Sequence, residues 1–152
     1  MDYVMEVKNL SKSYKGRKVL KDVSFGIYEG CITGFIGMNG AGKTTTIKSI
    51  LGLLKPDDGE INVFGMSMKD HEKAIKDRIG IVYDNGYLYN ELTMADMKGV
   101  IAPAYSHWDN DAYHSLMKRF RMDEKKKISE LSRGMRMKYA LVLALSHRAD
   151  LL

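Results

Sequence analysis

One eight-residue stretch constrains the fold more than any other part of the sequence. Residues 37–44 read Gly-Met-Asn-Gly-Ala-Gly-Lys-Thr, which matches the pattern G-x-x-x-x-G-K-[ST] at every fixed position. This pattern requires a buried strand that enters the loop and a helix that leaves it. The apolar segment Cys31–Ile36 predicts the strand and Thr44–Leu51 predicts the helix, so the sequence indicates an α/β fold.

The residue types in this loop indicate a site for phosphate groups. Glycines allow a tight turn in which successive backbone N–H groups point at an anion, at the positive end of the following helix. The Lys43 ammonium can reach the β- and γ-phosphates of a nucleotide, and the Thr44 hydroxyl can complete the coordination of Mg²⁺. We therefore predict binding of MgATP, with Lys43 also acting in catalysis. The predicted contacts are Asn39, Gly40, Ala41, Gly42, Lys43, Thr44 and Thr45.

The composition is that of an ordinary soluble domain. The 152 residues are 45% hydrophobic and 28% charged, which suffices for one core. No apolar run approaches the roughly 20 residues of a membrane-spanning helix, and the first residues do not read as a signal peptide, so a cytoplasmic location is expected. Cys31 is the only cysteine, which excludes an intramolecular disulfide, and its apolar neighbours predict a buried side chain.

The net charge of +5 is dispersed along the chain except at Lys125–Lys127. A short lysine run is usually a solvated face, and an anionic membrane surface or the acidic face of a partner are the alternatives. We expect no DNA or RNA partner.

The first half of the chain predicts strands. Tyr3–Val7 and Val19–Ile27 alternate apolar and polar residues, and the turn at Lys15-Gly16 between them predicts an antiparallel pair. A further short strand is expected at Glu60–Phe64, and a buried strand at Ile79–Tyr83. Between these two, residues 70–78 read as a short polar helix.

The second half predicts helices. Apolar spacing becomes helical from Thr93, and Trp108-Asp109 reads as the start of another helix. The methionines in this region are expected to fill a core. Ser132 is well placed to cap a strong helix that runs through Leu145.

The order of these features resembles the ATP-binding subunits of ABC transporters, particularly those that drive multidrug or antibiotic exporters, from Val4 to Leu152. Tyr14 matches the family's aromatic that stacks on adenine. Asp84 falls where the family has a glutamine, and Leu131–Met135 falls at its Leu-Ser-Gly-Gly-Gln signature.

The resemblance implies a P-loop NTPase core with an N-terminal antiparallel β-subdomain and an inserted α-helical subdomain. The whole of 1–152 would then be one ATP-binding domain. Residues 1–92 would form the α/β core, 93–145 the helical subdomain with the signature, and 146–152 the start of the Walker B strand.

The resemblance also implies roles for residues outside the loop. Ser132 and Gly134 would contact the ATP held by a second subunit in a head-to-tail dimer. Asp84 would be a weak or indirect ligand of Mg²⁺ with a minor catalytic role, or else an ordinary loop aspartate. Residues near 84–92 would contact transmembrane permease subunits, which places the protein on the inner face of the membrane.

Several family features have no counterpart in the sequence. The Walker B Asp-Glu pair and the switch histidine are absent, and Asp150 lies on the wrong side of the expected apolar run to replace them. We therefore expect the chain to bind ATP, to hydrolyse it poorly and to leave an apolar sheet edge exposed. Two alternatives stay open. The first is a non-catalytic nucleotide-binding module or truncated remnant. The second is a soluble ABC-type protein that acts on ribosomes or nucleic acid.

Overall fold

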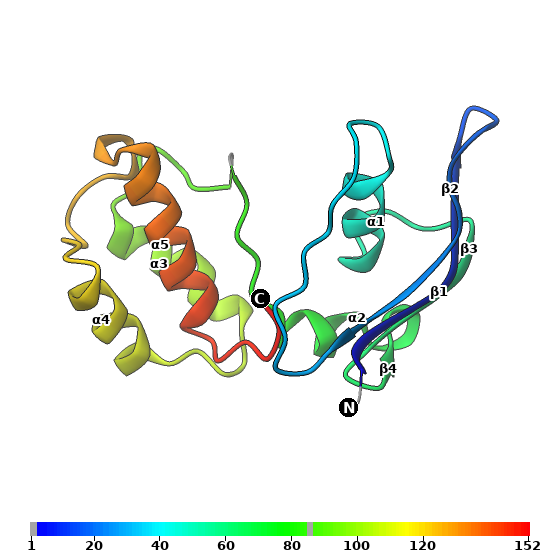
Figure 1. Cartoon of the computed structure of the whole chain (residues 1–152). Coiled ribbons are helices and arrows are strands. Elements are labelled where there is room, and N and C mark those ends of the chain that lie inside the picture. Colours follow the sequence, from blue (N-terminus) through cyan, green and yellow to red (C-terminus); the bar gives the residue numbers. More distant parts are fainter. Residues whose placement is uncertain (1–2, 85–86) are drawn as a thin grey trace. The chain divides into compact units, whose positions relative to one another are not determined.

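The computed structural model describes residues 3–84 and 87–152 (Figure 1). The chain divides into two compact units, the first ending at Lys76 and the second beginning at Asp77. Each unit is described by itself. No helix among the described residues has both the length and the hydropathy to cross a membrane.

The first unit is built on a four-stranded antiparallel sheet. Its strands are β1 (Tyr3–Tyr14), β2 (Arg17–Tyr28), β3 (Asp58–Val63) and β4 (Met66–Ser67), in the order β2-β1-β3-β4. The predicted pairing of the first two strands is confirmed, with Val7 opposite Phe25. Both strands are longer than the alternating patterns indicated, because pairing with a neighbour extends a strand beyond its apolar residues.

The turn between β1 and β2 sets the position of Tyr14. Lys15 and Gly16 both have positive φ, at 49° and 80°, as the two-residue turn favoured in hairpins requires. Tyr14 and Arg17 are the last cross-strand pair before this turn. The aromatic ring therefore lies at the end of β1, beside the tip of the hairpin.

Two helices complete the first unit: α1 (Lys43–Ile50) and α2 (Met68–Lys76). The helix predicted after the glycine loop is confirmed, as is a short helix before Asp77. Burial of apolar side chains from the sheet and the helices stabilises this unit by about 1.5–3 kcal/mol for each fully buried one. The buried side chains include Val7, Leu10, Leu20, Ile50, Ile61, Val63 and Ile75.

The prediction of a buried strand at Cys31–Ile36 is wrong. This segment belongs to no strand, and Ile32 and Ile36 are 104% and 95% exposed. A strand forms only when a neighbour accepts and donates its backbone hydrogen bonds, and none of the described strands pairs with this segment. The prediction of a buried Cys31 fails for the same reason, since its side chain is exposed.

The second unit is helical. It contains α3 (Met94–Ile101), α4 (Asn110–Arg119) and α5 (Arg133–Leu145), with the short 3₁₀ helices η1 (Ala102–Ala104) and η2 (Ile128–Glu130). In Figure 1 the three longer helices are grouped together, with α3 and α5 adjacent. The sequence prediction of a helical second half is confirmed.

Side-chain caps explain where these helices begin. Thr93 and Asp96 form a reciprocal capping box at α3. The Asp109 carboxylate accepts a hydrogen bond from the Ala112 N–H at α4, and the Ser132 hydroxyl accepts one from the Met135 N–H at α5. The predicted starts at Thr93, Trp108-Asp109 and Ser132 are therefore confirmed to within a residue.

An apolar core holds these helices together. Methionines supply three of its members, as predicted, because their flexible side chains fill irregular space. The Tyr139 hydroxyl donates a hydrogen bond to the backbone carbonyl of Met94 and so ties α5 to α3. The core consists of Met94, Met97, Tyr113, Met117, Ile128, Leu131, Tyr139, Val142 and Leu143.

The segment Ile79–Tyr83 makes only one strand-like contact among the described residues, a parallel bridge between Ile79 and Leu151. Ile79 is buried, as predicted, but no strand extends from it. Asp150 is exposed and forms an ion pair with Arg78, which agrees with its interpretation as a surface residue.

Candidate nucleotide-binding site

The loop of residues 37–44 has a shape that only glycine permits at two positions. Gly40 and Gly42 have φ of 83° and 94°, in the left-handed region. A Cβ at Gly42 would lie 2.6 Å from Cδ2 of Leu20, so a larger residue there would also collide with the core. Gly42 is therefore fixed both by its backbone angles and by its close contact with β2.

Lys43 folds back over the loop. Its Nζ donates hydrogen bonds to the carbonyl oxygens of Gly37 and Met38, at 2.6 and 2.9 Å. The Ala41 N–H also donates to the Met38 carbonyl, at 3.1 Å, which closes the turn. An ammonium has three donors, so one N–H of Lys43 remains for a phosphate oxygen.

The start of α1 suits an anion. Gly42 is its N-cap and has no side chain, so no side-chain cap occupies the amides of the first turn, and that turn contains no acidic residue. The positive end of the helix dipole therefore meets no carboxylate of its own helix. Helix α1 can hold a phosphate group at this end.

The three consecutive threonines of α1 differ in whether their hydroxyl groups are free to bind a ligand. Thr46 is buried, and its hydroxyl donates to the Gly42 carbonyl at 3.0 Å, so it is committed to the helix. Thr44 is exposed and Thr45 is half-buried. Thr44 and Thr45 are thus the available hydroxyls, which fits their predicted contacts with Mg²⁺ and phosphate.

Tyr14 offers an open aromatic face at the end of β1, where its side chain is 46% exposed. The strand end beneath it is held by Asp57, whose carboxylate accepts hydrogen bonds from Lys12 Nζ and from the Ser13 N–H, both at 2.7 Å. These two bonds hold the pKa of Asp57 below its usual value, the Lys12 bond being the larger cause. The sequence analysis did not identify this role of Asp57.

The signature segment lies at the start of α5 in the second unit. Ser132 caps the helix through the 3.3 Å bond from the Met135 N–H, and its side chain is exposed. A Cβ on Gly134 would meet nothing within 4 Å. The helix start is therefore open to an approaching group, and Gly134 adds no side chain to block it.

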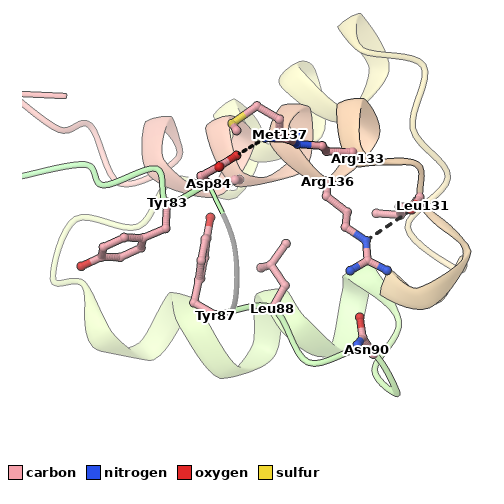
Figure 2. Close-up of a pocket in the computed structure, with 10 residues that line it drawn as sticks. Tyr83, Asp84, Tyr87, Leu88, Asn90, Leu131, Arg133, Arg136 and Met137 are labelled. Atoms are coloured by element: carbon pink, nitrogen blue, oxygen red, sulfur yellow. Dashed lines mark hydrogen bonds and ion pairs between the residues drawn. The ribbon is translucent and has the colours of Figure 1, made fainter. Parts of the chain in front are cut away.

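Asp84 is paired with Arg133. The two side chains form an ion pair with Nη2 of Arg133 2.8 Å from Oδ1 of Asp84, and both are largely exposed (Figure 2). By the resemblance described from the sequence, a glutamine is expected at position 84 and a glycine at position 133, where this chain has Asp84 and Arg133. The sequence did not predict this contact, although two opposite charges at two altered motif positions were a signal that could have found it.

An open groove of about 400 Å³ lies beside this ion pair. One wall includes Tyr83, Tyr87 and Leu88, and the other comes from the first half of α5 (Figure 2). Tyr83 and Tyr87 lie edge to face, with ring centroids 5.6 Å apart. The groove therefore has an aromatic wall opposite a helix that carries Arg133 and Arg136.

The described residues contain no cluster of three or more His, Cys, Asp or Glu side chains that could hold a metal by themselves. A Mg²⁺ ion bound at the start of α1 would therefore depend on phosphate oxygens together with a hydroxyl such as that of Thr44. The set of residues fits a metal that arrives with its nucleotide.

Comparisons with known proteins identify the family of the chain. Residues 20–152 match the model of the ABC transporter family. The chain is 34% identical over 149 residues to the ABC transporter ATP-binding protein YtrB of Bacillus subtilis, covering 98% of this chain and 51% of that protein. It is 31% identical over 154 residues to the bacitracin transport ATP-binding protein BcrA of Bacillus licheniformis, covering 100% of this chain and 50% of that protein. The chain thus spans about half the length of these relatives.

Solved structures give the same result. The chain superposes on the ATP-binding subunit of an ABC transporter with a TM-score of 0.85 and 32% identity, covering 96% of this chain and 63% of that one. It also resembles an ATP-binding cassette in a dimeric, post-hydrolysis state bound to ADP and Pi, with a TM-score of 0.79, 25% identity, and coverage of 95% and 70%.

Proposed function

Because the chain belongs to the ABC transporter family of ATP-binding proteins, we propose that it is the MgATP-binding part of a subunit that drives export through membrane partner subunits. The observation that carries the proposal is the geometry of the loop. Gly42 opens the start of α1, and Lys43 lies over the same loop with a donor to spare. Phosphate binding needs both features together.

The residues of the first unit would bind and orient the nucleotide. Tyr14 stacks on adenine, residues 39–42 and Lys43 surround the phosphates, and the hydroxyls of Thr44 and Thr45 face them. Mg²⁺, when bound with ATP, supplies charge neutralisation at the phosphate oxygens. Lys43 contributes a further positive charge where negative charge develops during phosphoryl transfer.

The second unit would act on a nucleotide held by another subunit. Ser132 and Gly134 at the start of α5 present a hydroxyl, a helix N-terminus and an open surface, which suit a terminal phosphate. The likeness to a dimeric structure with bound ADP and Pi supports a two-subunit arrangement. We place such a head-to-tail dimer at the inner face of the membrane, with permease subunits contacting residues near 84–92.

We expect the 152 residues alone to turn ATP over slowly. In-line attack on the terminal phosphate requires a positioned water, and the Asp84 carboxylate is engaged by Arg133 rather than free to hold one. This engagement favours the second candidate function, a nucleotide-binding module that holds ATP without hydrolysing it.

Binding and turnover measured on the same preparation distinguish the two functions. Titration calorimetry with MgATP should give saturable binding, and Lys43→Ala should weaken it by well over tenfold. Lys48→Ala is the matched control, because Lys48 is an exposed lysine in the same helix. An unchanged affinity of Lys43→Ala for MgATP would contradict the proposal. Tight binding without phosphate release would favour the non-hydrolysing module.

A further inference from the structure

Lys12 stands beside Tyr14, the residue proposed to stack on adenine. The two are separated by one residue in β1, the spacing at which side chains of a strand share one face of the sheet. The Lys12 Nζ lies over the Tyr14 ring, 5.9 Å from the ring centroid, within reach of a cation–π contact. The Lys12 side chain is only 15% exposed, so the cation is well covered while the ring beside it stays open.

Asp57 anchors both this cation and the strand that carries it. Its carboxylate accepts hydrogen bonds from Lys12 Nζ and from the Ser13 N–H, each at 2.7 Å. Its own N–H donates to the Ser11 carbonyl at 2.9 Å. Asp57 thus bonds to three consecutive residues of β1, and the next residue along the strand is Tyr14.

A short segment joins Asp57 to the phosphate-binding loop. Helix α1 leaves that loop and ends at Ile50, and only residues 51–56 separate its end from Asp57. The N–H groups of residues 53 and 54 both donate to the Lys48 carbonyl, at 2.8 and 3.1 Å, so the chain turns back tightly after the helix. Asp57 therefore connects the strand end that carries the aromatic ring with the element that would hold the phosphates.

Another ion pair of β1 provides a contrast. Lys8 Nζ lies 2.9 Å from Oε2 of Glu6, which belongs to the same strand, and the Lys8 side chain is 52% exposed. The pair of Lys12 and Asp57 is better covered and joins β1 to the chain that follows α1. An ion pair that only stabilised the strand would not need this connection.

We propose that Lys12 and Asp57 are positioning residues that prepare the Tyr14 ring for the base of the nucleotide. Asp57 fixes the Lys12 ammonium, and the ammonium attracts one face of the ring, so that the other face is presented to the base. Neither residue needs to touch the nucleotide. The proposal rests on the function proposed above, which supplies the ATP, and it extends the base site from one side chain to three.

Titration calorimetry with two ligands tests the proposal. MgATP carries a base, whereas the magnesium complex of inorganic tripolyphosphate carries a chain of phosphates without one. Lys12→Met removes the charge but keeps an unbranched side chain, and it should weaken MgATP binding about two- to fivefold. Its affinity for tripolyphosphate should equal that of the parent protein, because a defect confined to the ring affects only a ligand with a base.

Two further variants separate charge from shape. Asp57→Asn keeps an oxygen for the Ser13 N–H but loses the charge that holds Lys12, so it should weaken MgATP binding in the same way as Lys12→Met. Lys12→Arg keeps the cation, which can also stack on the ring, and should bind MgATP as the parent protein does. Thermal melting of each variant shows whether the first unit remains folded.

Lys8→Met is the matched control, because it breaks an ion pair of the same strand that does not involve Asp57. It should leave the affinity for both ligands unchanged. In a Tyr14→Ala background, Lys12→Met should cause no additional loss of MgATP affinity, since the cation acts through the ring.

Three results would overturn the proposal. They are equal losses of affinity for MgATP and tripolyphosphate in Lys12→Met, an MgATP affinity of Lys12→Met equal to that of Lys8→Met, and additive losses when Lys12→Met is combined with Tyr14→Ala. The parent protein still binds MgATP in each case, so the failure is distinguishable from failure of the proposed function. Absence of MgATP binding in the parent protein would instead reject the function itself.

Discussion

The two helices that carry the proposed ATP contacts begin in opposite ways. Helix α1 begins at Gly42, a residue in the left-handed conformation with no side chain to offer. Helix α5 begins at Ser132, whose hydroxyl already accepts the Met135 N–H. The first helix start is thus left open for a ligand, whereas the second satisfies part of its own hydrogen bonding. Strong binding is expected at α1, and a supplementary contact at α5.

Replacing a glycine by alanine at each of the two helix starts should give the largest difference in MgATP binding and stability. Gly42→Ala places a Cβ 2.6 Å from Leu20 Cδ2 at a φ of 94°, which should lower the free energy of unfolding by about 1–3 kcal/mol and abolish measurable MgATP binding. Gly134→Ala enters open space and should stabilise α5 by up to about 1 kcal/mol. Calorimetric titration and urea unfolding measure both; equal effects at the two positions would contradict the comparison.

Removal of the aromatic ring at the end of β1 should have the next largest effect. Tyr14→Ala should weaken binding of both ATP and GTP by about 1–3 kcal/mol, because a stacking ring does not distinguish the bases. Tyr14→Phe keeps the ring and should bind both nucleotides normally. A loss confined to ATP would instead indicate hydrogen bonding to adenine.

Loss of the serine cap should affect stability without affecting the first unit. Ser132→Ala removes the acceptor of the Met135 N–H and should destabilise the second unit by about 1 kcal/mol. The only tryptophan, Trp108, belongs to this unit, so its fluorescence reports the unfolding. MgATP binding by a single chain should not change, and a tenfold loss would mean that α5 contributes to the site in its own subunit.

The smallest effect is expected from the ion pair of Asp84 and Arg133. Because both side chains are exposed, their interaction should be weak and should vanish in high salt. A double-mutant cycle of Asp84→Asn and Arg133→Gln, unfolded with urea at low and at high ionic strength, measures it. A coupling that persists in high salt would show that the pair is part of a larger network.

Local signals in the sequence predicted the parts of this fold that local physics determines. The hairpin at Lys15-Gly16 and the caps at Asp109 and Ser132 depend on residues within a few positions of one another, and the structure confirms them. The methionine-rich core also followed from helical spacing. The placement of the loop glycines followed from the motif, since positive φ is required at Gly42.

The features that sequence reasoning missed depend on distant neighbours. Apolar residues at Cys31–Ile36 indicated a strand, but a strand also needs a hydrogen-bonding partner, which no residue pattern within the segment can reveal. The contacts of Asp84 with Arg133 and of Asp57 with Lys12 join residues 49 and 45 positions apart. Such pairs depend on the tertiary fold and not on spacing along the chain.

The bonds from Lys43 to its own loop have a consequence for the entropy of binding. A free lysine side chain loses about 1.5–2 kcal/mol of rotamer entropy when it is fixed in one geometry. In this loop the carbonyl oxygens of Gly37 and Met38 accept hydrogen bonds from Lys43 Nζ and fix its side chain. The loss of rotamer entropy therefore occurs when the chain folds, and nucleotide binding need not order the Lys43 side chain again.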